Sequence, residues 1–453
     1  MTATPTTTYT FGARPKSGLV FGLSGRHLLV AGTAGALGLG LLMAGQIVPA
    51  IMIGIVVFGL VAWPIGQERL VDWVWVRVGL LRRLLTGSAR RDDSTPVTGW
   101  VDASAGGRTW GVRTIGQSRG EVWLHVSGAP EFVLRSAEHQ DQLLAEWGMW
   151  LASLARESSP IKEVTWLEVA APSASGGPEA WMASHARPRT DEALRDYASL
   201  LDGLTSTSTE HEVYLRVQLQ PRTTRTDLAT ATATAASQLR ATIRPVSVEP
   251  MCAADVARLV EGLLVPGASL AAGARRARGD VPAAPQPIPP LLEGGDHVRI
   301  GSQRAQVWWA TELPRTPIRP DGLTQLFAVA VPCTRLLWTE FAPVSEWTAK
   351  RRAQGARTAL VSTRHGKIAK GNIPTFDEEQ ELADLEARAG ELLSGHAMLQ
   401  HSTFAAIIAP TGAILDEAAA TVESAAGTCG LMLRRLGPRQ RAALGALIPE
   451  VLP

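Results

Sequence analysis

Residues 27–67 contain no Asp, Glu, Lys or Arg, and this uncharged run limits what the chain can fold into more than any other feature. The run consists of two apolar blocks, Leu28–Ala44 and Ile47–Ile65, separated by Gly45-Gln46. A helix rises about 1.5 Å per residue, so each block reaches about 26–28 Å, close to the hydrocarbon thickness of a bilayer. The sequence therefore predicts a transmembrane hairpin over residues 27–66. One buried hairpin in a protein core is the alternative. A cleaved signal peptide is disfavoured because the run starts late and is too long.

The first apolar block carries small residues at helical spacing. Gly32, Ala36 and Gly40 lie four positions apart and therefore share one face of a helix. Small side chains let two helix backbones approach closely, so these three are predicted helix-packing residues. Alternatively, the spacing of these small residues is a chance result of composition, since the whole block is rich in Gly and Ala.

Residues 67–98 are predicted to form an interfacial basic helix and a linker that leave the membrane. Tryptophan rings favour the headgroup region, and arginine side chains can reach the lipid phosphates. The predicted membrane-interface residues are Trp63, Trp73, Trp75, Arg69, Arg77, Arg82 and Arg83. A core helix of the following domain over Val71–Leu85 is the alternative.

Basic residues flank the uncharged run on both sides. Arg14, Lys16 and Arg26 precede it, and the arginines named above follow it. Positive charge beside a membrane span marks the cytoplasmic side. The pattern predicts a multi-pass protein of the plasma (inner) membrane, with a cytoplasmic segment 1–26 and both termini cytoplasmic. Membrane lipid is accordingly a predicted partner.

The rest of the chain has room for two further domains. The 453 residues carry a formal net charge of +2, so no global field favours a nucleic-acid partner. The three cysteines (Cys252, Cys333 and Cys429) are far apart, which indicates a reducing compartment and argues against a disulfide framework or zinc site.

Alternating strands and helices predict two α/β domains of the ferredoxin-like, α+β kind, each an open sheet covered on one face. The first spans residues 99–264 and the second spans residues 297–453. Between them, residues 265–296 form a Pro/Gly/Ala linker with few apolar anchors. Among the predicted elements are strands Thr109–Ile115, Glu121–Ser127, Glu212–Gln220 and Thr358–Thr363, and helices Ala253–Leu264 and Phe376–Leu393.

No residue pattern predicts catalysis, a cofactor or a metal site. Gly366-Lys367 resembles the end of a phosphate-binding loop, but Val361 stands where that loop needs Gly and Ile368 where it needs Ser or Thr. His396 and His401 lack Cys, Asp or Glu at ligand spacing. A membrane-anchored enzyme is therefore disfavoured.

Near the N-terminus, the chain resembles a known family of membrane proteins. The residues concerned are Tyr9–Arg14, Gly18–Ser24, Trp63–Gly66, Leu70–Trp73 and Leu80–Arg83, around a two-span hairpin. They look like the PrgI-type integral membrane protein of actinobacterial conjugation systems. That protein is the inner-membrane hairpin subunit of type IV secretion.

The C-terminal part resembles a different protein of the same systems, the N-terminal (non-motor) domain of the conjugative traffic ATPase. The residues concerned are Leu360–Lys367, Glu378–Leu382, Glu391–His396, Val422–Ala426 and Gly430–Leu436. Together the two resemblances cover residues 9–85 and 300–453. They imply docking to a separate ATPase, and they give no reason to expect hydrolysis by this chain.

These observations predict a structural inner-membrane subunit of a conjugative type IV-like secretion machine that takes part in DNA transfer. Its predicted partners are the secretion ATPase and other channel subunits, in an oligomeric assembly, without direct nucleic-acid binding. A core membrane component of a type VII (ESX) secretion system is the alternative, because those proteins also begin with two spans and a basic, Trp-containing exit helix.

Overall fold

The computed structural model describes most of the chain in nine stretches. These are residues 25–62, 99–127, 135–172, 209–221, 227–264, 288–314, 322–369, 376–393 and 397–448, without 157, 245 and 330. Shorter pieces are 64–65, 68–69, 77–78, 81, 90–91, 196, 316, 318–319, 371 and 373. All structural statements below concern these residues.

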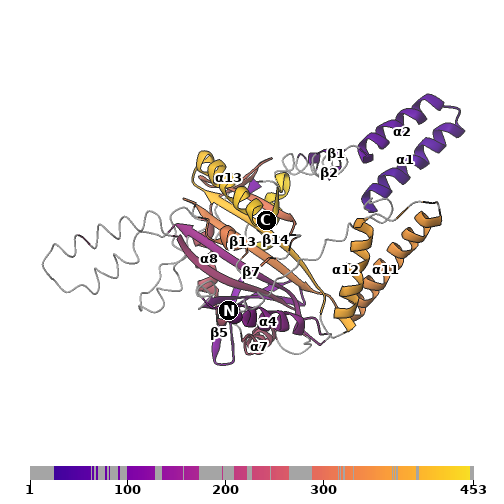
Figure 1. Ribbon diagram of the computed structural model, residues 1–453. Helices are drawn as coiled ribbons and strands as arrows, with labels where there is room; N and C mark the ends of the chain where they lie inside the picture. The colour runs from indigo at the N-terminus through magenta and orange to yellow at the C-terminus, as the bar shows by residue number, and fades with distance from the viewer. Residues whose placement is uncertain are drawn as a thin grey trace.

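One antiparallel sheet of 13 strands dominates the described part (Figure 1), in the order β3-β10-β11-β12-β14-β13-β7-β8-β6-β5-β4. Two further strands pair beside this path, β15 with β12 and β9 with β6. The strands are β3 (Arg90–Arg91), β4 (Trp100–Ala105), β5 (Arg108–Ile115), β6 (Arg119–Ser127), β7 (Ile161–Pro172), β8 (Thr209–Leu219), β9 (Ser247–Pro250), β10 (Leu291–Glu293), β11 (Val298–Ile300), β12 (Gln303–Glu312), β13 (Thr334–Pro343), β14 (Leu399–Ala409) and β15 (Met432–Arg435).

Helices cover the sheet or project from it. They are α1 (Gly25–Met43), α2 (Ile47–Ala62), α4 (Ala137–Ser153), α7 (Leu228–Arg240), α8 (Ala253–Leu264), α10 (Thr324–Phe327), α11 (Glu346–Ala369), α12 (Phe376–Leu393), α13 (Gly412–Thr428) and α14 (Gln440–Leu447). A separate two-stranded ladder joins β1 (Pro64–Ile65) to β2 (Glu68–Arg69).

The prediction of two separate ferredoxin-like, α+β domains behind a membrane hairpin is wrong, because the strands of both parts form a single sheet. Strand β7 pairs with β13 from Ala170↔Arg335 to Val164↔Phe341. An unpaired sheet edge leaves a row of backbone donors and acceptors open. If the two parts formed separate sheets, β7 and β13 would each be such an edge. Here the backbone groups of these two strands pair with each other.

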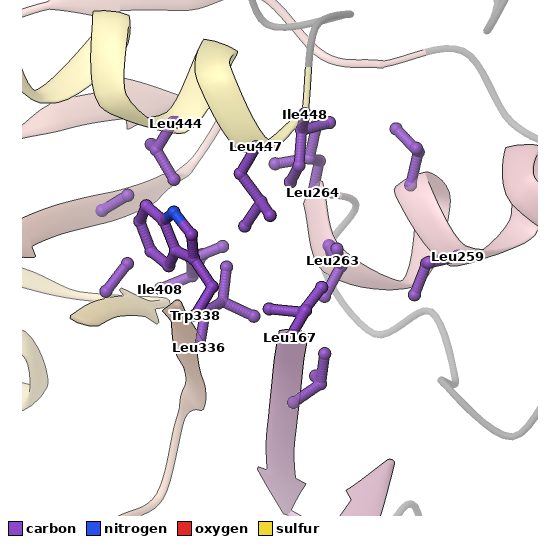
Figure 2. Packing of buried hydrophobic residues seen from close by; sticks show 14 of the residues in the cluster. Leu167, Leu259, Leu263, Leu264, Leu336, Trp338, Ile408, Leu444, Leu447 and Ile448 are labelled. Atoms are coloured by element: carbon purple, nitrogen blue, oxygen red, sulfur yellow. The ribbon is translucent and has the colours of Figure 1, made fainter. Parts of the chain in front are cut away.

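One face of the sheet packs on α8 and on the C-terminal segment that contains α14. Figure 2 shows Leu444 and Leu447 over Trp338, with Leu263 of α8 near Leu167 of the adjacent strand. The ring of Trp338 also stacks on Phe404, with 5.1 Å between ring centroids. Helices from far-apart parts of the sequence therefore share one apolar cluster.

The other face is also covered, so the predicted one-sided covering is wrong. Helices α4 and α7 pack over strands β4 to β8, where Trp147 lies edge-on to Trp166 with ring centroids 5.1 Å apart. Helices α10 and α13 pack over β12 to β15 around Trp308 and Leu337. Burial on both faces lets the central strands be apolar on both sides.

The transmembrane hairpin is also corrected, because no helix in the described part of the chain has the length and apolar character needed to cross a bilayer. The two apolar blocks do form helices, but Pro64 already belongs to strand β1. Helix α2 has 16 residues, which span about 24 Å at the helical rise, against about 30 Å of hydrocarbon. This finding contradicts the predicted multi-pass placement in the plasma (inner) membrane.

Several local predictions can be compared directly with the structure. Helices Ala253–Leu264 and Phe376–Leu393 are confirmed, as are the strands β5, β6 and β8. The predicted strand Thr358–Thr363 is wrong, because these residues lie inside α11. From the predicted linker 265–296, residues 288–296 are described, and there Ile288 and Leu291 join the core.

A buried arginine attaches the C-terminal helix to the middle of the sheet. Arg216 of β8 is 1% exposed, and its guanidinium donates to the carbonyl oxygens of Ala446 and Leu447 at the end of α14. It also donates to Glu163 Oε1 at 2.7 Å and to Thr165 Oγ1 at 3.2 Å. The last carbonyls of a helix lack intrahelical partners, so a cation there satisfies them and complements the helix dipole.

We expect the substitution Arg216→Met to lower the free energy of unfolding by about 3 kcal/mol, because it leaves buried acceptors without their charged donor. Chemical denaturation measures this change. The matched control is Arg108→Met, which removes an exposed ion pair with Glu249 and should cost less than about 1 kcal/mol. Equal effects of the two substitutions would contradict the role given to Arg216.

Glu340 on β13 is a half-buried carboxyl beside the same arginine. Burial raises its pKa, Glu163 raises it further by repulsion, and Arg216 partly opposes the shift. A carboxyl whose pKa is higher in the folded state stabilises the fold below its unfolded pKa. That stability is lost as the pH rises through the folded pKa.

We therefore expect Glu340→Gln to raise the free energy of unfolding, relative to wild type, more at about pH 7 than at about pH 4. Urea titrations at the two pH values test this difference. Glu346→Gln is the control of opposite sign, since the hydrogen bond from Lys350 and its charge lower the pKa of Glu346. A gain from Glu340→Gln that does not change with pH would refute the assignment.

Candidate docking surfaces

The buried charged groups of the sheet are engaged in structural contacts. Arg335 of β13 donates to the backbone carbonyls of Leu326, Phe327 and Val329 at the end of α10. Burial lowers the pKa of Arg335 and raises that of the Cys333 thiol to about 12. Because the thiolate is the reactive form of cysteine, this shift disfavours reaction of Cys333 at neutral pH.

Two histidine–glutamate pairs lie on adjacent strands. His211 Nδ1 is 3.0 Å from Glu168 Oε1, and His125 Nε2 is 2.6 Å from Glu212 Oε2. The pairs sit on opposite faces of the sheet, since consecutive residues of β8 alternate in direction. Tyr214 packs on His125, and burial together with the charge of Glu212 raises the pKa of its phenol. The two pairs therefore do not share one site.

Metal-ligating side chains do not gather in the described residues. No group of three or more His, Cys, Asp or Glu there is arranged to hold a metal ion. Cys252, Cys333 and Cys429 are free thiols. His401 lies exposed on β14, and Gly366-Lys367 lie within α11, whereas His396 is outside the described residues.

The helix pair α1/α2 exposes a large apolar surface. Figure 1 shows the pair extending away from the sheet. Its exposed side chains include Leu37, Leu39, Leu42, Met43, Ile47, Val48, Ile51, Met52, Ile55 and Val56. Monomeric proteins rarely expose contiguous apolar patches of this extent, and such patches are typical of surfaces that a partner covers.

The predicted helix-packing residues lie on this surface. Gly32, Ala36 and Gly40 are exposed, and a methyl group added at Gly32 or Gly40 would meet no other described atom within 4 Å. These small residues are thus not required for the packing of α1 on α2. Their role in packing against another helix remains a prediction.

The structure describes only part of the predicted membrane-interface set. Arg77 is exposed, and one of its Nη atoms lies 3.3 Å from where a Cβ of Gly295 would be. The backbone of Arg69 belongs to β2, where it pairs with Pro64. Trp63, Trp73, Trp75, Arg82 and Arg83 lie outside the described residues, as does most of Val71–Leu85. The sequence-based assignment of these side chains is therefore not tested.

A second helix pair, α11/α12, is inserted between the neighbouring strands β13 and β14. It projects from the end of the sheet (Figure 1), and the 24 residues of α11 span about 36 Å. Ala349, at the base of α11, is buried, but no described side chain of α12 is. The sequence did not predict this projection, because Thr358–Thr363 was expected to be a strand.

A narrow apolar seam holds α11 and α12 together. Half-buried residues recur at spacings of three and four on both helices, which places them on facing stripes. They are Ala353, Ala356 and Leu360 on α11, and Leu382, Leu385 and Ala389 on α12. Leu392 continues the stripe on α12. Because none of these side chains is fully buried and three of them are alanine methyl groups, the seam buries little apolar area.

The two helices carry opposite charge. Helix α11 has six basic residues and one acidic residue, a net charge of +5. Helix α12 has seven acidic residues and one basic residue, a net charge of −6. Between them, Arg357 Nη2 lies 3.7 Å from Glu386 Oε1.

The base of α11 also exposes a large aromatic side chain. Trp347 is 65% exposed, and the guanidinium carbon of Arg351 lies 5.3 Å from its ring centroid. Such a cation–π pair orients both side chains without burying them. Trp and Arg are enriched among the residues that dominate binding energy at protein interfaces. This patch is therefore a candidate contact site.

No protein-family model and no curated protein matches this chain. The resemblance to the PrgI-type protein and to the traffic ATPase therefore rests on the sequence stretches given above. Three of those stretches lie at α11/α12: Leu360–Lys367 falls within α11, Glu378–Leu382 falls within α12, and Glu391–His396 begins in the last turn of α12.

We expect the sheet to fold without the α11/α12 pair. Val344 N donates to Met398 O at 3.0 Å and continues the β13–β14 ladder toward the helices. Replacing residues 346–396 by Asn-Gly, which favours a tight hairpin turn, closes that ladder. The thermal unfolding midpoint should shift by less than about 5 °C, as calorimetry would measure. An unfolded or aggregated product would contradict the view that the pair is an addition to the core.

Proposed function

We propose that this chain is a structural subunit of a conjugative type IV-like secretion machine, in which it binds the separate traffic ATPase and other channel subunits. The proposal does not include membrane anchoring, because no described helix can cross a bilayer. In this role the large sheet is a rigid body, and the projecting helix pairs are its contact surfaces.

The exposed apolar surface of α1/α2 is the observation that carries this proposal. Val48, Met52 and Ile55 lie on one face of α2 at spacings of four and three, and each is more than half exposed. Burial of apolar area stabilises a contact by about 25 cal/mol per Å². A partner that covers this face would therefore gain affinity from surface that is otherwise in water.

The identity of the partner is suggested by the resemblance. The likeness to the non-motor domain of the traffic ATPase covers residues 300–453, and the likeness to the hairpin subunit covers residues 9–85. A chain that resembles parts of two neighbouring components is well suited to connect them. This argument is by analogy, so the partner needs a direct test.

Tagged full-length protein, cross-linked in conjugating actinobacterial cells and purified, should recover the traffic ATPase. The triple substitution Val48→Ser, Met52→Gln and Ile55→Gln should lower that recovery at least about tenfold, equivalent to about 1.4 kcal/mol. Quantitative mass spectrometry measures the recovery. All three positions are exposed, so the substitutions should leave the fold intact.

Val101→Ser provides the matched control. Val101 is 50% exposed on β4, at the edge of the sheet far from β13 and β14, and its substitution should leave recovery unchanged. Three results would overturn the proposal: wild-type protein without a secretion ATPase, recovery of type VII core subunits instead, or unchanged recovery by the triple variant.

A further inference from the structure

We propose that the chain self-associates through its projecting helix pair, with α11 of one copy docking against α12 of a second copy. This contact would repeat, between copies, the pairing of a basic with an acidic helix that each copy already contains. The inference does not depend on the proposed function, because it concerns different helices and a different partner.

The opposite net charges of the two helices carry the argument. A net charge of +5 on α11 faces a net charge of −6 on α12. Contacts of α11 with α11, or of α12 with α12, would bring like charges together and are disfavoured. Charge complementarity therefore selects contact of α11 with α12, either reciprocally in a two-fold pair of copies or head to tail in a ring or filament.

The outer faces of both helices are built for close approach. On α11, Arg351, Gly355, Thr358 and Ser362 are exposed and lie on one face, opposite the seam. On α12, Gln380, Ala383, Ala387 and Gly390 occupy the equivalent face and are also exposed. Small side chains in the middle of each face let the backbones approach, and charged side chains flank them.

The base of the pair gives the contact its direction. Arg351 and Arg352 lie near the start of α11. Asp384 lies in the middle of α12, and Glu391 lies in its last turn. The start of α11 and the end of α12 both join the sheet, so these residues occupy neighbouring levels when copies stand side by side. Trp347, exposed beside Arg351, adds an aromatic anchor at this level.

The isolated pair also needs additional packing. Helices of this length gain most of their stability from tertiary contacts. In α11/α12 the narrow seam and the Ala349 contact at the base supply that packing. A helix of a neighbouring copy packed on each outer face would supply further contacts. Basic α11 and acidic α12 helices would then alternate along a continuous layer.

The test exchanges charge between the two helices. The first variant carries Arg351→Glu and Arg352→Glu, and the second carries Asp384→Arg and Glu391→Arg. Light scattering after size exclusion measures the molar mass of the full chain. We expect wild type to exceed the 48.2 kDa of one chain and to lose this excess in about 1 M salt, where the Debye length is about 3 Å.

Each variant alone should have the mass of one chain, because its reversed charges meet charges of the same sign on its neighbour. An equimolar mixture should recover the wild-type mass, because the reversed charges at positions 351 and 352 of the first variant then meet the reversed charges at positions 384 and 391 of the second. The remaining contact in the mixture is a native one. If assembly is restored only in the mixture, the contact is formed by α11 of one copy with α12 of another.

Two controls separate assembly from folding. Arg119→Glu with Arg299→Glu makes the same change in net charge as the first variant, at exposed positions on β6 and β11, and should assemble as wild type does. Hydrogen exchange of α11 and α12 should show that both helices persist in the charge-reversed variants. The variant that lacks residues 346–396 should have the mass of one chain.

Three outcomes would overturn the proposal: a wild-type chain with the mass of one copy in low salt, variants that keep the wild-type mass, or a mixture that does not reassemble. A wild-type mass that persists when residues 346–396 are removed would place self-association elsewhere, on α1/α2 for example. None of these outcomes bears on recovery of the traffic ATPase, so the two proposals can fail separately.

Discussion

The antiparallel pairing of β7 with β13 is the constraint on which the rest of the structure depends. It joins strands about 170 positions apart in the sequence, from Ala170↔Arg335 to Val164↔Phe341. This pairing joins what would otherwise be two sheets into one. As a result, α8 and α14 pack on the same hydrophobic cluster around Trp338 and Leu167. Without it, two open edges would each expose unpaired backbone groups.

The sequence predicted local elements much better than their assembly. Alternation in β8 and the apolar stripe of α8 are local signals, and both elements were predicted close to their observed bounds. The β7–β13 pairing leaves no such signal, because any apolar strand could pair at either edge. Thr358, Val361 and Thr363 favour a strand by propensity, but the seam with α12 makes their segment helical.

For the candidate site, the sequence predicted an apolar helical hairpin. It did not predict the lengths of its helices or how the pair extends from the sheet. Helices over Leu28–Ala44 and Ile47–Ile65 follow from composition, whereas helix length is decided by where β1 begins at Pro64. The helix-capping roles of Arg216 and Arg335 could not be predicted, since their carbonyl partners are distant in sequence or set by tertiary packing. Helix α12 was predicted, but its pairing with a long α11 was missed because a strand was expected within α11.

Two projecting helix pairs of opposite character suit a protein with two kinds of contact. The exposed large side chains of α1/α2 are apolar, so this surface can supply affinity but little discrimination. The α11/α12 pair presents charge of both signs in a fixed order, which gives direction and selects against wrong pairings. Because α11/α12 extends from β13 and β14, a load on those helices would pass directly to the β7–β13 junction. The same pairing that closes the core would then connect the proposed contact between copies to the rest of the sheet.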